Sequence, residues 1–198
     1  MTAGLSRDEA ERLLAAATET GARLRALVLL LLGTGLRVSE AIRADTGDLS
    51  VEKGRRVLLV TRKGGKRQRI GLPAAVDSAI RAYVGGRQGP LFMDTDGRAR
   101  MTRQQADYYL RKLSKAAGLD VEVSPHVLRH TAATLALDEG APLRDVQVQL
   151  GHARPDTTAR YDRARRDLDN AAARALGELV DGAARVTRAG SERPRPAA

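Results

Sequence analysis

The sequence predicts a mainly α-helical protein of the α+β class with one short β region. Apolar residues recur at helical spacing along most of the 198 residues, and capping residues or glycines bound these segments. Between about residues 47 and 72 the pattern changes to short β-branched and apolar runs around a pair of glycines. A chain of this length suits one domain that is large enough to bury a core.

The composition favours a polyanionic partner. The net charge is +10 and the isoelectric point is about 10.7, with many more arginines than lysines. Clustered arginines neutralise phosphates and displace counterions, and the alternative is a basic protein with no such partner. Because the chain has four tyrosines, one phenylalanine and no tryptophan, rows of aromatics that stack on single strands are not expected. The balance therefore favours a grip on the phosphate backbone of a duplex.

The chain contains no cysteine, which rules out a disulfide framework and fits a reducing cytoplasm. The longest apolar run, residues 26–32, is far shorter than the roughly 20 residues of a membrane span. The first residues also lack the basic and apolar regions of a secretion signal. We therefore expect a cytoplasmic protein that does not enter a membrane.

Three helices are expected before the β region. Ser6 and Glu9 form a capping box that opens the first helix. The second, near residues 21–32, is apolar enough to lie at the centre of the core, and Gly-Thr-Gly at 33–35 is expected to break it. A third, short helix begins at Arg37. The G-x-G pattern does not indicate a dinucleotide loop, because a helix precedes it and its third glycine position is not glycine.

A β-hairpin is expected next. Its strands are Val57–Thr61 and Ile70–Leu72, and Gly64-Gly65 between them is a two-residue turn signal. Lys63 and Lys66 flank the turn, at a hairpin tip from which a lysine could reach into a substrate. An ordinary solvated turn is the alternative interpretation.

Five further helices are expected. They lie near residues 73–84, 102–117, 125–140, 143–150 and 167–180. In the fourth of these, Leu143, Val146 and Leu150 lie on one face. In the last, an apolar stripe from Leu168 to Leu179 is expected to dock on its own core or on a neighbouring subunit. Residues 183–198, rich in Arg, Pro, Gly and Ala, are predicted to form a disordered basic tail.

One stretch of the chain concentrates the candidate catalytic groups. Ser124 is a favoured N-cap and Pro125 suits the first helical position, so a helix is expected to begin there. His126 and Arg129 are three residues apart and therefore share one face of that helix. A helix N-terminus attracts phosphate and disfavours a protonated histidine. A neutral imidazole beside an arginine at such a position suits phosphoryl chemistry, with Tyr161 as the nucleophile.

A zinc site is the alternative for the two histidines of H-V-L-R-H at 126–130, which are four residues apart. The zinc motif H-E-x-x-H needs a glutamate at the position of Val127. With three histidines and no cysteine, a zinc site would need all three histidines or an added carboxylate. We therefore expect no metal.

Taken together, these segments resemble the catalytic domain of the tyrosine recombinases, the phage-integrase and Xer-like site-specific recombinases. T-G-L-R-V-S-E at 34–40 looks like the first box of the family, and V-T-R-K-G-G-K-R at 60–67 looks like the hairpin that carries a catalytic lysine. H-V-L-R-H is similar to the second box, and L-G-H at 150–152 with a tyrosine nine residues later completes the set. The resemblance implies six site residues, with Lys66 as the alternative lysine: Arg37, Lys63, His126, Arg129, His152 and Tyr161.

The resemblance also implies the fold and its extent. We expect the tyrosine-recombinase catalytic core, with a small three-stranded antiparallel sheet, over residues 1–182 and the basic tail over 183–198. Members of the family usually carry an N-terminal helical core-binding domain that closes a clamp around DNA. The first box begins at residue 34, so this domain is expected to be absent. A separate core-binding domain or an accessory protein is then expected as a partner.

By the same resemblance, the chain is a site-specific DNA recombinase or integrase that cleaves and rejoins strands through a 3′-phosphotyrosine, without metal, cofactor or ATP. Arg37 and Arg129 would clamp the non-bridging phosphate oxygens. His126 would accept the tyrosine proton, Lys63 would protonate the leaving 5′ oxygen, and His152 would hydrogen-bond the phosphate. The implied partners are double-stranded DNA and a homotetramer formed through the C-terminal helix, in the nucleoid of the cytoplasm. The alternatives are a type IB topoisomerase and a non-enzymatic DNA-binding remnant.

Overall fold

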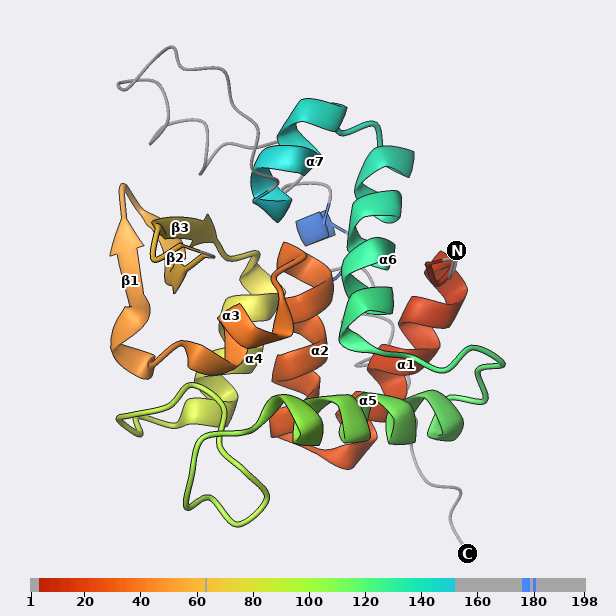
Figure 1. Cartoon of the computed structure of the whole chain (residues 1–198), viewed down its shortest axis with the longest axis horizontal. Helices are drawn as coiled ribbons and strands as arrows, with labels where there is room; N and C mark the ends of the chain where they lie inside the picture. Colours follow the sequence, from red (N-terminus) through yellow and green to blue (C-terminus); the bar gives the residue numbers. More distant parts are fainter. Residues whose placement is uncertain (1–3, 63, 152–175, 179, 181–198) are drawn as a thin grey trace, which may run out of the picture.

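The fold was determined as a computed structural model, which describes residues 4–62, 64–151, 176–178 and 180. In these residues the helices form the larger part of the molecule and a small sheet lies at one side (Figure 1). The expected mainly helical α+β fold is therefore confirmed. In chain order the elements are α1 (Arg7–Thr20), α2 (Ala22–Thr34), α3 (Val38–Arg43), the 3-10 turn η1 (Thr46–Asp48), β1 (Leu49–Glu52), β2 (Arg55–Thr61), β3 (Arg67–Gly71), α4 (Ala74–Val84), α5 (Arg103–Ala116), α6 (Pro125–Asp138) and α7 (Leu143–Leu150).

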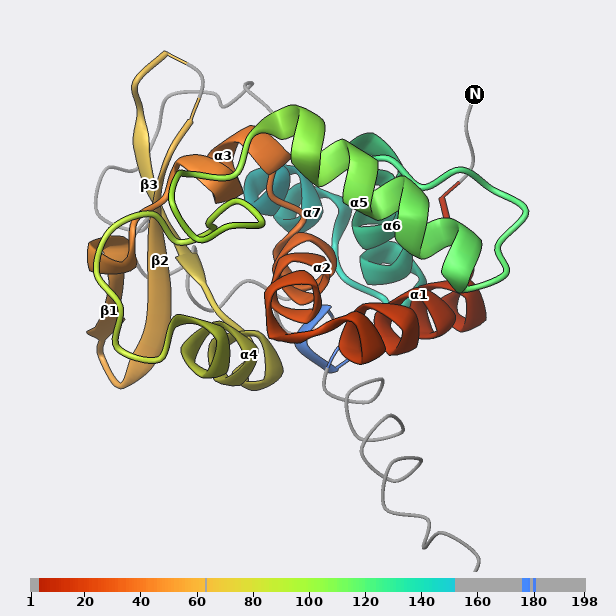
Figure 2. The ribbon, with the colours of Figure 1, turned by 90° about the horizontal axis from the view of Figure 1, so that it is seen from below.

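Helix α2 is the centre of the core, as its sequence predicts. Residues 27–32 are each no more than 2% exposed, because a helix that is apolar on every side must be covered on every side. Helices α1, α4 and α6 pack around it, and Figure 2 shows α2 between α4 and α1. This burial fixes the end of α2, where the motif T-G-L-R-V-S-E of residues 34–40 begins.

The end of α2 differs from the expectation. The helix was expected near residues 21–32, with Gly-Thr-Gly at 33–35 breaking it. It continues through Gly33 to Thr34, and Gly35, whose φ of 64° lies in the left-handed region, caps it. Gly33 is a packing glycine, since a Cβ at this position would lie 2.8 Å from a methyl group of Val76 on α4. A glycine inside an apolar helix thus marks close approach of a neighbour and not a helix end.

The three strands form an antiparallel sheet in the order β1-β2-β3, as expected. Leu58 on β2 stands between Leu49 on β1 and Ile70 on β3, and the apolar side chains of this row join the helical core. The hairpin between β2 and β3 is confirmed, but β3 begins at Arg67, three residues before the expected Ile70. The ladder is closed beyond the strand ends by a hydrogen bond of 2.8 Å from the Arg62 amide to the Lys66 carbonyl.

Local capping signals gave the helix starts correctly. In the box that opens α1, the Glu9 amide donates to the Ser6 hydroxyl and the Ser6 amide donates to the Glu9 carboxylate. Thr102 caps α5 in the same way. The Ser124 hydroxyl accepts the amide of Val127 at 3.3 Å, so α6 begins where the sequence predicts.

The expected apolar face of α7 is only partly buried. Val146 and Leu150 are buried in a small cluster with α6, whereas Leu143 is 59% exposed. Ala141, which lies just before the first residue of α7, is also buried in this cluster.

At the other end of the chain, Leu176 packs in the α6–α7 cluster and Val180 packs in the main core. The rest of the expected last helix and the tail at 183–198 lie outside the described residues. Within the described residues, no helix is long and apolar enough to cross a membrane.

Candidate active site

Arg129 joins three helices at the centre of the candidate site. It lies one turn into α6 and is half-buried. One terminal nitrogen donates to the Gly35 carbonyl at the end of α2, at 2.7 Å, and the other donates to the Leu150 carbonyl at the end of α7. The last carbonyls of a helix lack partners within the helix and carry partial negative charge, so a guanidinium is a fitting partner for them. These bonds fix the plane of the guanidinium.

Arg37 begins the next helix and is held by a single carboxylate. Its terminal nitrogen lies 3.0 Å from one oxygen of Glu40, and its amide donates to the other oxygen at 2.9 Å. The side chain of Arg37 is 41% exposed, whereas that of Glu40 is 5% exposed. The arginine therefore presents part of its guanidinium to solvent from an anchored position.

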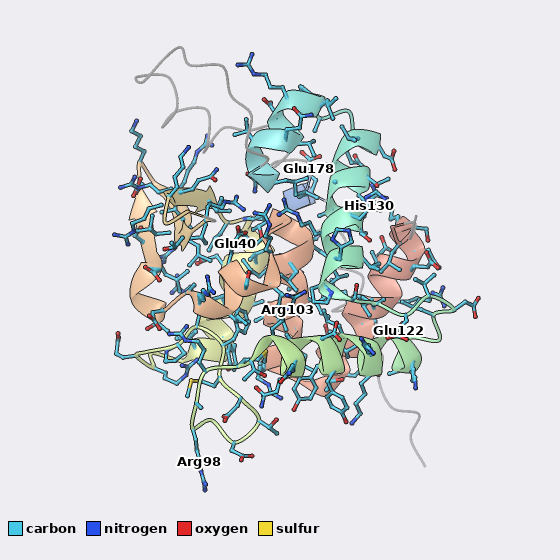
Figure 3. The ribbon with its side chains drawn as sticks, viewed as in Figure 1. Glu40, Arg98, Arg103, Glu122, His130 and Glu178 are labelled. Carbon is cyan, nitrogen blue, oxygen red and sulfur yellow. The ribbon has the colours of Figure 1, made fainter. Side chains whose placement is uncertain are left out.

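Glu40 also pairs with a second arginine, Arg62, at the end of β2. The distance from the Arg62 terminal nitrogen to the Glu40 carboxylate is 2.8 Å, and both side chains are at most 6% exposed. Arg62 further donates to the Gln68 side chain at 2.9 Å and to the Gln149 carbonyl at 2.8 Å. Glu40, labelled in Figure 3, is buried on α3 beside the sheet.

The electrostatics of this cluster favour an anion. Burial, then the neighbouring charges of Arg37 and Arg62, lower the pKa of Arg129 to about 10, while Glu40 acts in the opposite direction. Arg129 is still fully charged at neutral pH. The cluster thus contains three guanidinium cations and one carboxylate. The resulting excess of positive charge is exposed to solvent at Arg37.

Two glycines allow the helix ends to meet at this site. Gly35 has a φ of 64°, and a Cβ there would lie 2.5 Å from the Leu150 side chain. Gly151 has a φ of 67°, and a Cβ there would lie 2.9 Å from the guanidinium carbon of Arg62. Both glycines belong to motifs that the sequence singles out, T-G-L-R-V-S-E and L-G-H. Each is needed both for its backbone conformation and for the space around it.

The remaining predicted residues are placed only in part. His126 is exposed in the first turn of α6, one turn before Arg129. The alternative lysine, Lys66, is exposed near the hairpin tip. Lys63, His152 and Tyr161 lie outside the described residues. The structure thus brings Arg37 and Arg129 into one cluster, and all six assignments stay predictions.

Two residues of the site were missed by the sequence reasoning. Glu40 lies three residues after Arg37, a spacing that allows an ion pair on a helix, so this signal was available. Arg62 gave no such signal, because its partners come from distant parts of the chain. As for metals, no group of three histidine or carboxylate side chains among the described residues is arranged to hold an ion.

The comparisons with known proteins identify the family. The model of the phage integrase family matches residues 4–167, and the chain belongs to this family. Among its relatives are tyrosine recombinases: XerC of Rhodospirillum centenum is 42% identical over 147 residues, which are 71% of this chain and 42% of the relative. XerA of Thermococcus kodakarensis is 38% identical over 164 residues, which are 79% of this chain and 56% of the relative. The chain thus spans about half the length of these curated relatives.

Solved structures agree with this assignment. The crystal structure of a XerA recombinase aligns with a TM-score of 0.70 and 28% identity, over 98% of this chain and 67% of the other. The integrase of mycobacterium phage Brujita aligns with a TM-score of 0.68 and 26% identity, over 90% of this chain and 63% of the other. The chain therefore has the catalytic fold of the tyrosine recombinases.

Proposed function

We propose that this chain is the catalytic part of a site-specific DNA recombinase, which cleaves and rejoins DNA strands through a 3′-phosphotyrosine without metal or ATP. The observation that carries the proposal is the anchored pair Arg37 and Arg129 in a cluster with excess positive charge. A relative of the same fold, XerH, has been solved on its difH substrate before and after cleavage, which supports duplex DNA as the substrate class.

The two arginines suit a phosphate because only part of their hydrogen-bonding capacity is used. Each terminal nitrogen of a guanidinium carries two N–H groups. In Arg129 each terminal nitrogen gives one N–H to a carbonyl, which leaves the second N–H on each for a ligand. Arg37 is likewise fixed by Glu40 while its side chain is 41% exposed. Donors that are already fixed stabilise the charge that grows on the non-bridging oxygens without reorganising.

The proposed step is a transesterification at phosphorus. The Tyr161 oxygen attacks, the bond between phosphorus and the 5′ oxygen breaks, and a phosphotyrosyl ester forms at the 3′ end. His126 takes the phenolic proton, and Lys63 gives a proton to the departing 5′ oxygen. His152 donates a hydrogen bond to the phosphate. The new ester conserves the energy of the broken one, so the reverse reaction rejoins the strand without ATP.

The assembly follows from the same proposal. The catalytic domain covers residues 1–182, a basic tail follows at 183–198, and the protein acts on DNA in the cytoplasm, at the nucleoid. A homotetramer on paired sites, joined through the C-terminal helix, would carry out the exchange. A separate core-binding domain or an accessory protein would complete the clamp around DNA.

A trapped covalent adduct tests the proposal. A pool of duplexes with randomised sequence, each carrying a nick that lets the short fragment with the new 5′-hydroxyl diffuse away, is incubated with the protein at low salt. Species that resist SDS are isolated and their DNA is sequenced. Wild type should give an adduct on one sequence class, and Tyr161→Phe should give none. No adduct from wild type would refute the proposal.

Two further outcomes test the details. An adduct formed by Tyr161→Phe would mean that the nucleophile is misassigned, with Tyr108 and Tyr109 as the next candidates. Strand exchange between two duplexes that carry the selected site is expected. Relaxation of a supercoiled plasmid without exchange would instead assign the chain to the type IB topoisomerases.

A further inference from the structure

Arg62 is a buried cation that the six proposed site residues do not include. It follows the last residue of β2, and its side chain is 6% exposed. An arginine is seldom so deeply buried unless it is paired. Every nitrogen of its guanidinium has a partner: Nε donates to Gln68, one terminal nitrogen donates to Glu40 and the other to the Gln149 carbonyl. A buried side chain with this many bonds has one geometry.

These bonds connect the hairpin to the residues that hold Arg37 and Arg129. Glu40, which receives Arg62, also holds Arg37. The Leu150 carbonyl accepts from Arg62 at 3.4 Å and also accepts from Arg129. Arg62 therefore shares an acceptor with each of the two proposed phosphate-binding arginines.

The fit around Arg62 is close. The Gly151 backbone lies against the guanidinium, so closely that a Cβ would stand 2.9 Å from its central carbon. A lysine at position 62 could pair with Glu40, but a single ammonium cannot reproduce the planar fork that also reaches Gln68 and the end of α7. The geometry depends on arginine and not only on positive charge.

Losing Arg62 would loosen the hairpin more than the arginine pair. Arg37 keeps its own bonds to Glu40, which lies within the same short helix. Arg129 keeps its bond to the Gly35 carbonyl. The hairpin, by contrast, would lose the side chain that ties it to both α3 and α7.

We propose that Arg62 is a positioning residue for the recombination reaction, an inference that rests on the proposed function. It holds the β2–β3 hairpin on α3 and α7. Lys63, the proposed general acid, is the next residue in the sequence, so the position of Arg62 would set where the chain enters Lys63, relative to the phosphate proposed to bind Arg37 and Arg129.

The experiment compares two leaving groups on the sequence recovered from the covalent selection. One duplex carries the ordinary 5′ oxygen at the cleaved bond, and the other carries sulfur there. An alkoxide needs a proton to leave, whereas a thiolate does not, because a thiol has a pKa of roughly 8.5. Lys63→Ala is the reference for complete loss of the proposed general acid. Its cleavage of the oxygen substrate should be nearly abolished, and its cleavage of the sulfur substrate should be close to wild type.

The test variant is Arg62→Lys, which keeps a cation beside Glu40. Its cleavage of the oxygen substrate should fall about 100-fold, the size of effect that a small misplacement of a reacting group produces. Its cleavage of the sulfur substrate should stay close to wild type. The matched control is Arg69→Lys, the same exchange on β3 of the same hairpin, where the arginine is exposed and pairs with Glu52. The control should cleave both substrates like wild type.

The outcomes separate the two proposals. No adduct from wild type would refute the proposed function itself. If wild type cleaves and Lys63→Ala shows the rescue, equal losses of Arg62→Lys on both substrates would overturn the role of Arg62 in hairpin placement, as would full activity on both. Should Arg62→Lys fail to fold by circular dichroism, Gln68→Met replaces it. That variant removes one acceptor of Arg62, so its cleavage rate on the oxygen substrate should fall by up to about tenfold, while its rate on the sulfur substrate stays at the wild-type value. The same change relative to wild type on both substrates would refute the inference.

Discussion

Gly35→Ala should destabilise the protein far more than the same substitution at another helix end. Gly35 caps α2 with φ 64° and ψ 18°, and Gly85 caps α4 with φ 57° and ψ 29°. The two backbones are nearly the same, so an alanine has a similar conformational cost at each, about 1–2 kcal/mol. Around Gly85 nothing lies within 4 Å of the added Cβ. Gly85→Ala is therefore the matched control for the backbone alone.

At Gly35 the added methyl group also meets a neighbour. It would lie 2.5 Å from a methyl carbon of Leu150 and 3.6 Å from the Cβ of Ala132. Leu150 is 4% exposed, in the cluster between α6 and α7, so it has little room to move. Overpacking of this kind costs about 1–3 kcal/mol. We expect Gly35→Ala to lose about 2–5 kcal/mol of unfolding free energy in all, against about 1–2 kcal/mol for Gly85→Ala.

Equilibrium unfolding in urea measures both losses, provided that the slope of the free energy against urea is unchanged. Activity gives a second readout. The Leu150 carbonyl holds Arg129, so displacing Leu150 should lower covalent adduct formation in Gly35→Ala and leave Gly85→Ala unaffected. Equal losses of stability in the two variants would show that Leu150 yields freely and would refute the packing argument.

Two further predictions concern charge. Glu40→Gln should lower the unfolding free energy by about 3–5 kcal/mol in urea titrations, because it leaves the buried Arg62 without its carboxylate; a loss below about 1 kcal/mol would mean that the pair is not needed for stability. Duplex binding by this chain alone should be weak and should fall steeply between about 50 and 200 mM salt in fluorescence anisotropy, since phosphate contacts dominate it. Tight binding that is insensitive to salt would contradict that expectation.

Local signals explain which parts of the fold the sequence could predict. The box of Ser6 and Glu9, the cap at Ser124 and the glycine at the end of α4 each act within one helical turn, and each was read correctly. The end of α2 was expected near residue 32 and lies at Thr34, because the sequence alone does not show whether a glycine such as Gly33 ends a helix or makes room for a neighbour. Val76, which decides between the two, lies 43 positions further along the chain.

The same difference between local and long-range signals decides which residues of the candidate site could be predicted. Arg37 and Arg129 were predicted because each stands in a short motif, and the structure brings them to one cluster. Glu40, which holds Arg37, and the buried Arg62 that pairs with it were not predicted. Arg62 and the Gln149 carbonyl are separated by 87 positions in sequence, and a charged residue at the end of a strand usually indicates exposure. Burial of that charge becomes acceptable only because Glu40 on α3 and the Gln149 carbonyl on α7 both accept from it.

The buried carboxylate explains how an arginine cluster can exist before DNA arrives. Three guanidiniums at this density repel one another, and the lowered pKa of Arg129 records that repulsion together with burial. Glu40 offsets part of it by pairing with Arg37 and Arg62 at once. In the proposed complex a phosphodiester brings one further negative charge, and one cation is still in excess. The second charge that develops on the phosphate oxygens in the transition state is attracted by this remaining excess of the cluster. An electrostatic match that is completed in the transition state lowers the barrier, whereas a match completed in the ground state would only tighten binding.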